Sequence, residues 1–259
     1  MRAQIAITRT GVIQASPGQT PPEGGALARR INGDFIVSLH RKVSEAALVQ
    51  LLRSLRALDP DFRMSLDTAE KVREGLTRRQ VCHRIALYAI SIVERANENM
   101  FMSNLELFNA AHPPSTLLSE NLLRLAGLNL ATDDTPSALM RVSAANIDNL
   151  VSVGQNRSMR LYFLAIPEDH MWPGTAPPPG APIDDFVDAP SWRWLSLIYE
   201  AALAIQAAMF QHGFLRLHGG NMRPFQRFIY PITPPHEQPG NYRVLTAAEI
   251  MESPDLVII

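Results

Sequence analysis

Residues 81–93 constrain the fold more than any other segment, because their apolar side chains would cover nearly every face of a helix. Thr77-Arg78-Arg79-Gln80 directly precedes them and fits a capping box, which predicts that a helix begins here. A helix without a continuous polar face has to be enclosed by other elements. We therefore expect this helix at the centre of the molecule, with these side chains mostly in the core: Val81, Ile85, Leu87, Tyr88, Ile90 and Ile92.

Helical periodicity continues on either side of this segment. Ser44 fits an N-cap before a stripe of leucines, and Asp59-Pro60 predicts where that helix ends. Further helices are expected at about 67–75, 103–111, 115–127, 136–153 and 190–212. The predicted fold class is therefore mainly α: a helical core bundle with an extended N-terminal arm and a small C-terminal β-hairpin or strand region, α+β overall.

The composition divides the chain into five expected segments. The first is an extended arm, because apolar and polar residues alternate around the turn-rich sequence SPGQTPPEGG. The third, residues 157–190, contains a segment rich in proline, which prevents regular structure and which we call the strap. The expected segments are 1–42 (extended N-terminal arm), 43–156 (helical core), 157–190 (a strand and a Pro-rich acidic strap), 191–213 (buried core helix) and 214–259 (C-terminal β-rich extension).

No segment of the sequence indicates that the protein crosses a membrane or is secreted. Residues 194–210 are apolar, but Glu200 and Gln206 interrupt them, so a helix buried in protein is the simpler interpretation. Residues 1–10 lack the basic region followed by an apolar region that marks a secretory signal. We therefore expect the protein in the cytoplasm of a host cell or in a virion.

The usual catalytic motifs do not occur in the sequence. It contains no P-loop, no dinucleotide-binding glycine motif, no zinc-protease motif and no nucleophile elbow. The only cysteine, Cys82, excludes an intramolecular disulfide and reads as a small buried apolar residue. His218-Gly219-Gly220 favours a hairpin turn over an oxyanion hole. We expect no catalytic, metal-binding or cofactor-binding residues and no cofactor.

Positive charge gathers near both ends of the chain, although the net charge is only −1. Residues 1–42 hold six basic residues and two acids, and residues 214–243 hold four arginines and one acid. Residues 167–190 hold five acids and neither Lys nor Arg. Arginine suits both phosphate and carboxylate, so the basic segments could meet nucleic acid or an acidic strap on a neighbouring copy.

The candidate contact residues come from these charged segments. Those expected to contact nucleic acid or another subunit are Arg29, Arg30, Arg41, Arg216, Arg223 and Arg227. Those expected to make acidic contacts between subunits are Asp184, Asp185 and Asp188. The alternative is that all of these charges are merely solvated.

Three functions are compatible with these features. The leading hypothesis is a self-assembling structural subunit, such as a viral or phage coat or nucleocapsid protein, whose arms contact neighbouring copies and viral nucleic acid. The second is an enzyme of unrecognised type, with a pocket between the helical core and the C-terminal strands. Some of His170, His212, His218 and Arg216 would line that pocket. The third is a non-enzymatic adaptor that binds a different protein.

Overall fold

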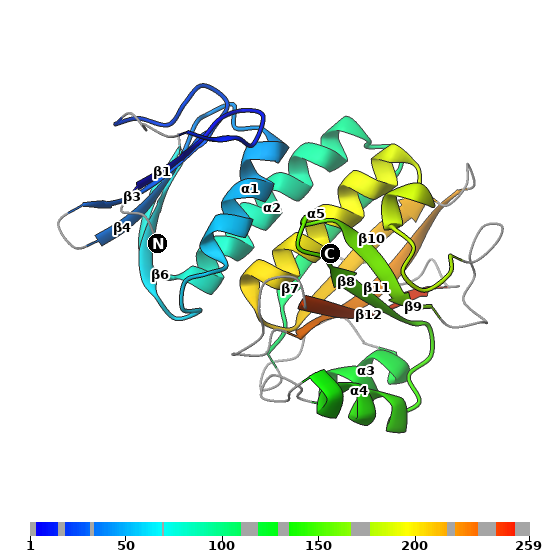
Figure 1. Cartoon of the computed structure of the whole chain (residues 1–259). Helices are drawn as coiled ribbons and strands as arrows, with labels where there is room; N and C mark the ends of the chain where they lie inside the picture. The colour runs from blue at the N-terminus through cyan, green and yellow to red at the C-terminus, as the bar shows by residue number, and fades with distance from the viewer. Residues whose placement is uncertain are drawn as a thin grey trace. The chain divides into compact units, whose positions relative to one another are not determined.

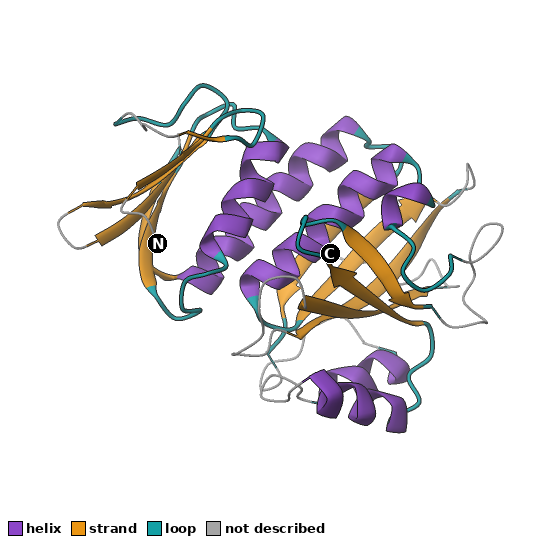
Figure 2. Cartoon of the chain, viewed as in Figure 1, coloured by secondary structure: helices purple, strands orange, loops and turns teal. Residues whose placement is uncertain are grey.

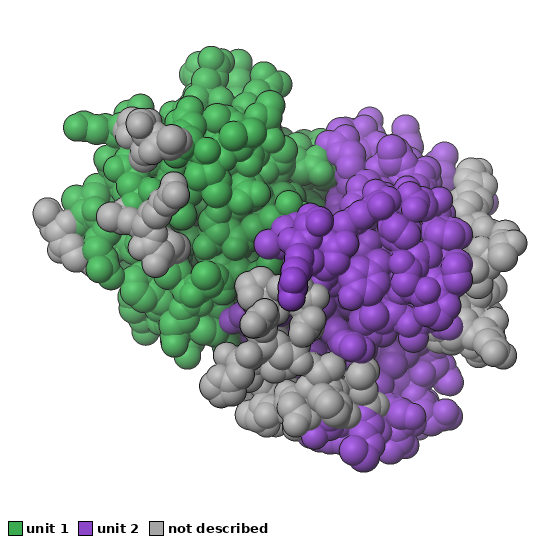
Figure 3. All heavy atoms as spheres, viewed as in Figure 1, with its two compact units in different colours: residues 1–95, 197–205 green, residues 96–196, 206–259 purple. Residues whose placement is uncertain are grey.

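A computed structural model describes residues 4–14, 19–31, 34–68, 70–109, 119–128, 135–166, 177–216, 221–232 and 242–251. These residues contain two six-stranded sheets and five α-helices (Figure 2). The chain divides into two compact units (Figure 3). Unit 1 comprises Met1–Arg95 and Leu197–Ile205, and unit 2 comprises Ala96–Ser196 and Gln206–Ile259.

Unit 1 is built on a sheet with the strand order β2-β1-β3-β4-β5-β6. Its neighbouring strands are antiparallel except β4 and β5, which run parallel with Val37 opposite Leu66. Parallel strands cannot be joined by a tight turn, and here a helix, α1, connects them. The strands are β1 (Gln4–Ile7), β2 (Ile13–Gln14), β3 (Ala26–Ile31), β4 (Asp34–Leu39), β5 (Arg63–Asp67) and β6 (Val72–Thr77).

Helix α1 (Glu45–Leu55) and all but the last residue of helix α2 (Arg78–Ala96) belong to unit 1. Both helices are labelled in Figure 1. Both predicted helix starts are confirmed. The Ser44 hydroxyl accepts a hydrogen bond from the Ala47 amide at 3.1 Å. The Gln80 amide donates to the Thr77 hydroxyl at 3.2 Å, and the Thr77 amide donates back to the Gln80 side chain at 2.9 Å.

The buried face of α2 is narrower than the sequence predicts. Leu87, Tyr88 and Ile92 are only half-buried, although their neighbours lie in the core. The helix therefore has one apolar stripe that packs inward and a second side that is partly open. The buried stripe consists of Val81, Cys82, Ile85, Ala86, Ala89, Ile90 and Val93.

Two arginines of unit 1 hold the C-terminal half of α5 (Ala189–Ile205). Arg78 is fully buried and donates to the carbonyl oxygen of Ala204, in the last turn of that helix, and to the carbonyl oxygen of Asp59. A cation at this position complements the partial negative charge of a helix C-terminus, while burial lowers the pKa of the Arg78 guanidinium. The Arg53 Nε donates at 2.8 Å to Glu200, whose side chain is 1% exposed.

Unit 2 contains an antiparallel sheet with the order β7-β10-β11-β12-β8-β9. Helices α3 (Glu120–Gly127) and α4 (Thr135–Ala144) cover one face, where Leu122 and Val142 pack with Phe210 and Phe228 (Figure 1). The strands are β7 (Phe101–Leu107), β8 (Leu150–Gln155), β9 (Leu161–Ala165), β10 (Met209–Arg216), β11 (Met222–Ile232) and β12 (Tyr242–Ile250).

The other face of this sheet packs against the first turns of α5. The ring of Trp194 stacks on Phe101 with centroids 4.7 Å apart, and the Arg227 guanidinium lies 4.9 Å from the Trp194 centroid. Arg227 is 6% exposed, so this cation–π contact is largely sheltered from water. A short 3₁₀ helix, Ile183–Asp185, precedes α5.

The predicted fold class is wrong, because strands rather than a helical bundle form the framework. Residues 4–39 hold β1 to β4, so this region forms four neighbouring strands of a sheet instead of an extended arm. The helices predicted at about 67–75 and 103–111 are replaced largely by β6 and β7. Pairing with another strand overrides the local helical pattern in both cases, with β5 directly before it for β6 and with β10, far later in the chain, for β7. Residues 252–259, at the end of the predicted C-terminal β-rich extension, lie outside the described residues.

Replacing Ile85 with Ala should lower the free energy of unfolding by about 2–5 kcal/mol, because this fully buried side chain would leave a cavity. The matched control is Leu87→Ala, which removes a half-buried leucine from the same helix and should cost clearly less. Urea titrations followed by circular dichroism would compare the two. Equal losses would show that the two sides of α2 are packed alike.

Candidate functional site

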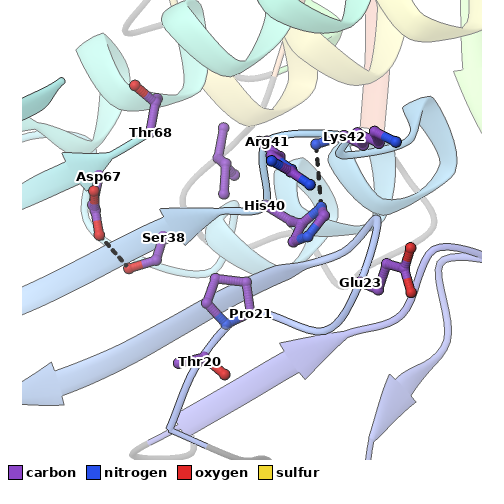
Figure 4. Close-up of a pocket in the computed structure, with 10 residues that line it drawn as sticks. Thr20, Pro21, Glu23, Ser38, His40, Arg41, Lys42, Asp67 and Thr68 are labelled. Carbon is purple, nitrogen blue, oxygen red and sulfur yellow. Dashed lines mark hydrogen bonds between the residues drawn. The ribbon is translucent and has the colours of Figure 1, made fainter. Parts of the chain in front are cut away.

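A polar pocket lies where β4 and β5 end in unit 1 (Figure 4). These two strands are parallel, so their carboxyl ends meet at one edge of the sheet, where open sheets commonly bind ligands. The pocket has a volume of about 680 Å³, within the range of small-molecule sites. Its lining residues are Thr20, Pro21, Glu23, Ser38, Leu39, His40, Arg41, Lys42, Asp67 and Thr68.

The strand pairing brings a hydroxyl and a carboxylate together in this pocket. Ser38 on β4 lies opposite Asp67 on β5, and its hydroxyl donates to Asp67 Oδ2 at 3.2 Å (Figure 4). Ser38 is 6% exposed, whereas Asp67 is half-buried. A carboxylate oxygen can accept several hydrogen bonds, so Asp67 keeps the capacity to bind a ligand hydroxyl or amine.

His40 follows β4 and has a defined tautomer when neutral. Its Nδ1 accepts hydrogen bonds from the backbone amides of Gly24 and Lys42, both at 3.1 Å. Since Nδ1 is an acceptor, the proton of the neutral ring lies on Nε2. That N–H is a potential donor to a ligand in the pocket.

The charges around the pocket have both signs. Arg41 and Lys42 are exposed and lie shortly before Ser44, the N-cap of α1. The positive end of the helix dipole lies near these cations and adds to their attraction for an anion. Glu23 and Asp67 supply the acidic groups. The pocket is therefore suited to a ligand that combines an anionic group with hydroxyl or amino donors.

Only one of the six predicted arginines lines this pocket. Arg41 lies there, whereas Arg29 and Arg30 are on β3 of the same unit, with Arg29 half-buried and Arg30 exposed. The remaining three, Arg216, Arg223 and Arg227, lie on β10 and β11 of unit 2. The strand register puts Arg216 on one face of that sheet and the other two on the opposite face.

The three predicted acidic residues all make contacts within the chain. Arg160 donates to Asp184 at 3.0 Å and to Asp185 at 2.9 Å. The hydrogen bond to Asp184 is the main cause that raises the pKa of Arg160 above its ordinary value. Asp188 accepts from the Ser191 amide at 2.8 Å and so caps the start of α5.

The histidines considered for an enzyme pocket give one pair in the described residues. His212 on β10 lies 3.2 Å from Glu106 on β7, and its ring stacks on Phe210. Arg216 is on the same strand, while His170 and His218 lie outside the described residues. In the part of the chain that the structure describes, no group of three or more His, Cys, Asp or Glu side chains could hold a metal ion.

Sequence reasoning missed Ser38, His40 and Asp67. The sequence does carry a weak signal for this site. DFIVSLH and RMSLD both end in polar residues, and the structure shows that they form neighbouring parallel strands.

Comparison with known proteins adds no further signal, since no protein family model, curated protein or solved structure matches this chain. Among the described residues, no helix is both long enough and apolar enough to cross a membrane.

Cys82 should be unreactive in the folded protein. Burial raises the pKa of its thiol to about 12. At about pH 8 an exposed cysteine is partly ionised, whereas the Cys82 thiol stays protonated and therefore unreactive. Ellman's reagent should therefore label Cys82 slowly in the native protein and rapidly in urea. Rapid labelling without urea would show that α2 opens in the native state.

Proposed function

We propose that the protein is a ligand-binding protein whose unit 1 pocket holds a small phosphorylated sugar. The observation that carries this proposal is the convergence of Ser38, His40 and Asp67 where the parallel strands β4 and β5 end. This arrangement brings donors and acceptors from separate segments to one concave surface. Small-molecule sites commonly use a few convergent polar groups to orient their ligand.

The cations of the pocket favour a phosphate group. Arg41 can form two parallel hydrogen bonds to phosphate, and Lys42 adds a second positive charge beside it. The His40 Nε2–H provides a neutral donor nearby. Together with the N-terminus of α1, these groups would balance a phosphate dianion.

The carboxylates favour hydroxyl groups on the same ligand. Asp67 and Glu23 would repel a simple anion, but each can accept hydrogen bonds from sugar hydroxyls. A sugar phosphate uses both halves of the pocket, whereas phosphate alone or sugar alone uses only one. This complementarity selects the proposed ligand class.

The proposal is tested with ribose 5-phosphate, ribose and inorganic phosphate in calorimetric titrations. Ribose 5-phosphate should bind most tightly. Arg41→Ala should weaken its binding about ten-fold or more, because a charge-assisted hydrogen bond is worth roughly 1.5–3 kcal/mol. The same variant should leave the affinity for ribose nearly unchanged.

Asp67→Asn provides the complementary measurement, because it should weaken ribose more than inorganic phosphate. Arg30→Ala is the matched control, since Arg30 is an exposed arginine of the same unit outside the pocket lining. Absence of binding by all three compounds would overturn the proposal. Equal losses in Arg30→Ala and Arg41→Ala would show that general charge, rather than the pocket, attracts the phosphate.

Self-assembly is the second candidate function, and the observation in its favour is the edge strand β6. Val72 on this strand is 54% exposed, and Arg73 and Glu74 follow it. In an antiparallel pairing of two β6 strands centred between these residues, each arginine would lie opposite the other copy's glutamate. However, the register shift between β5 and β6 is a feature that protects sheet edges, which ranks assembly second.

If β6 mediates assembly, Glu74→Arg should abolish it by placing like charges opposite each other. Combining Arg73→Glu with Glu74→Arg should restore it, because the opposite charges face each other again. Light scattering during size-exclusion chromatography measures the outcome. A wild-type monomer at high protein concentration would end this candidate.

A further inference from the structure

A single ring nitrogen connects two segments that form the pocket. His40 Nδ1 accepts from the Gly24 amide, which follows the segment carrying Thr20 and Glu23, and from the Lys42 amide in the turn before α1. Figure 4 shows the ring of His40 between these two segments. The imidazole therefore positions both sides of the pocket at once.

Backbone hydrogen bonds hold the same two segments together independently of the ring. The His40 amide donates to the Gly25 carbonyl oxygen at 3.1 Å, and the Ser44 amide donates to the Gly24 carbonyl oxygen at 2.9 Å. Gly24 has φ +67°, a conformation that other residues adopt only with strain. Loss of the contacts to the ring would consequently shift the pocket locally without unfolding unit 1.

We propose that protonation of His40 opens the pocket, so that the protein releases its sugar phosphate at mildly acidic pH. This inference rests on the proposed function of unit 1. A protonated imidazole has a hydrogen on both nitrogens and no acceptor, so Nδ1–H would face two amide donors. Histidine is the side chain that ordinarily changes charge between about pH 5 and 8.

Other charged groups lie around the ring on every neighbouring segment. Those that line the pocket with it are Glu23, Arg41, Lys42 and Asp67, while Arg9 packs against Gly24. Glu23 and Asp67 are acidic, and the other three are basic. The added positive charge would also attract phosphate, but solvent screens charges at this exposed rim. The two amides would lose their shared acceptor on the ring, which separates the segments that hold the ligand, so the net effect of acid is release.

The sensitivity to acid should disappear in His40→Asn. An asparagine Oδ1 lies at nearly the same place as the histidine Nδ1 and can accept both amides, but it does not titrate. Wild-type affinity for ribose 5-phosphate should fall at least about ten-fold more than that of His40→Asn between about pH 7.5 and about pH 5.5. The comparison cancels the titration of the phosphate itself, because both proteins are measured with the same compound.

The outcomes separate this inference from the proposed function. If wild type does not bind at about pH 7.5, the proposed function fails. If wild type binds and its affinity falls no more steeply with acid than that of His40→Asn, the inference is wrong and the proposed function stands.

A measurement without ligand covers the case in which the variant fails to fold. In wild type, the chemical shifts of the His40 ring nitrogens in NMR spectra report its protonation. Hydrogen exchange should show that the amides of Gly24 and Lys42 lose protection in parallel. Protection that persists after the ring is protonated would overturn the inference.

Discussion

The parallel pairing of β4 with β5 is the constraint on which the rest of unit 1 depends. Two parallel neighbours need a crossover, and α1 supplies it between Leu39 and Arg63. The same connection brings the ends of both strands and the start of α1 to one edge of the sheet. Ser38, Asp67 and the cations before Ser44 therefore meet because of topology, although they are distant in sequence.

The helices of this protein could be predicted from sequence far better than its strands. The Ser44 cap and the Thr77–Gln80 capping box are local signals, and both form as expected. The hairpin of β10 and β11 is similarly local, and the sequence predicted it approximately. By contrast, β7 pairs with β10 more than a hundred residues later, and no local pattern contains that information. A strand such as Phe101–Leu107 could thus be mistaken for a helix.

The candidate site was less predictable than the fold, because it depends on a pairing that is not local. Alternation in DFIVSLH correctly indicates an extended conformation, but it does not identify the neighbouring strand. Only the pairing with β5 brings Ser38 to Asp67. The role of His40 is similarly hidden, since its two partners are backbone amides whose positions follow from the turn geometry.

Counting charges along the chain does not by itself locate a charged surface, for a related physical reason. Alternate residues of a strand point to opposite faces, so a basic segment need not make a basic surface. Arg216 and Arg227 belong to one positively charged segment, yet they lie on opposite faces of their sheet. Arg227 is buried against Trp194, where its planar guanidinium contributes to packing as well as charge. Strand register and burial therefore decide which arginines of this protein are accessible, and Arg41 is exposed in the turn after β4, beside the pocket.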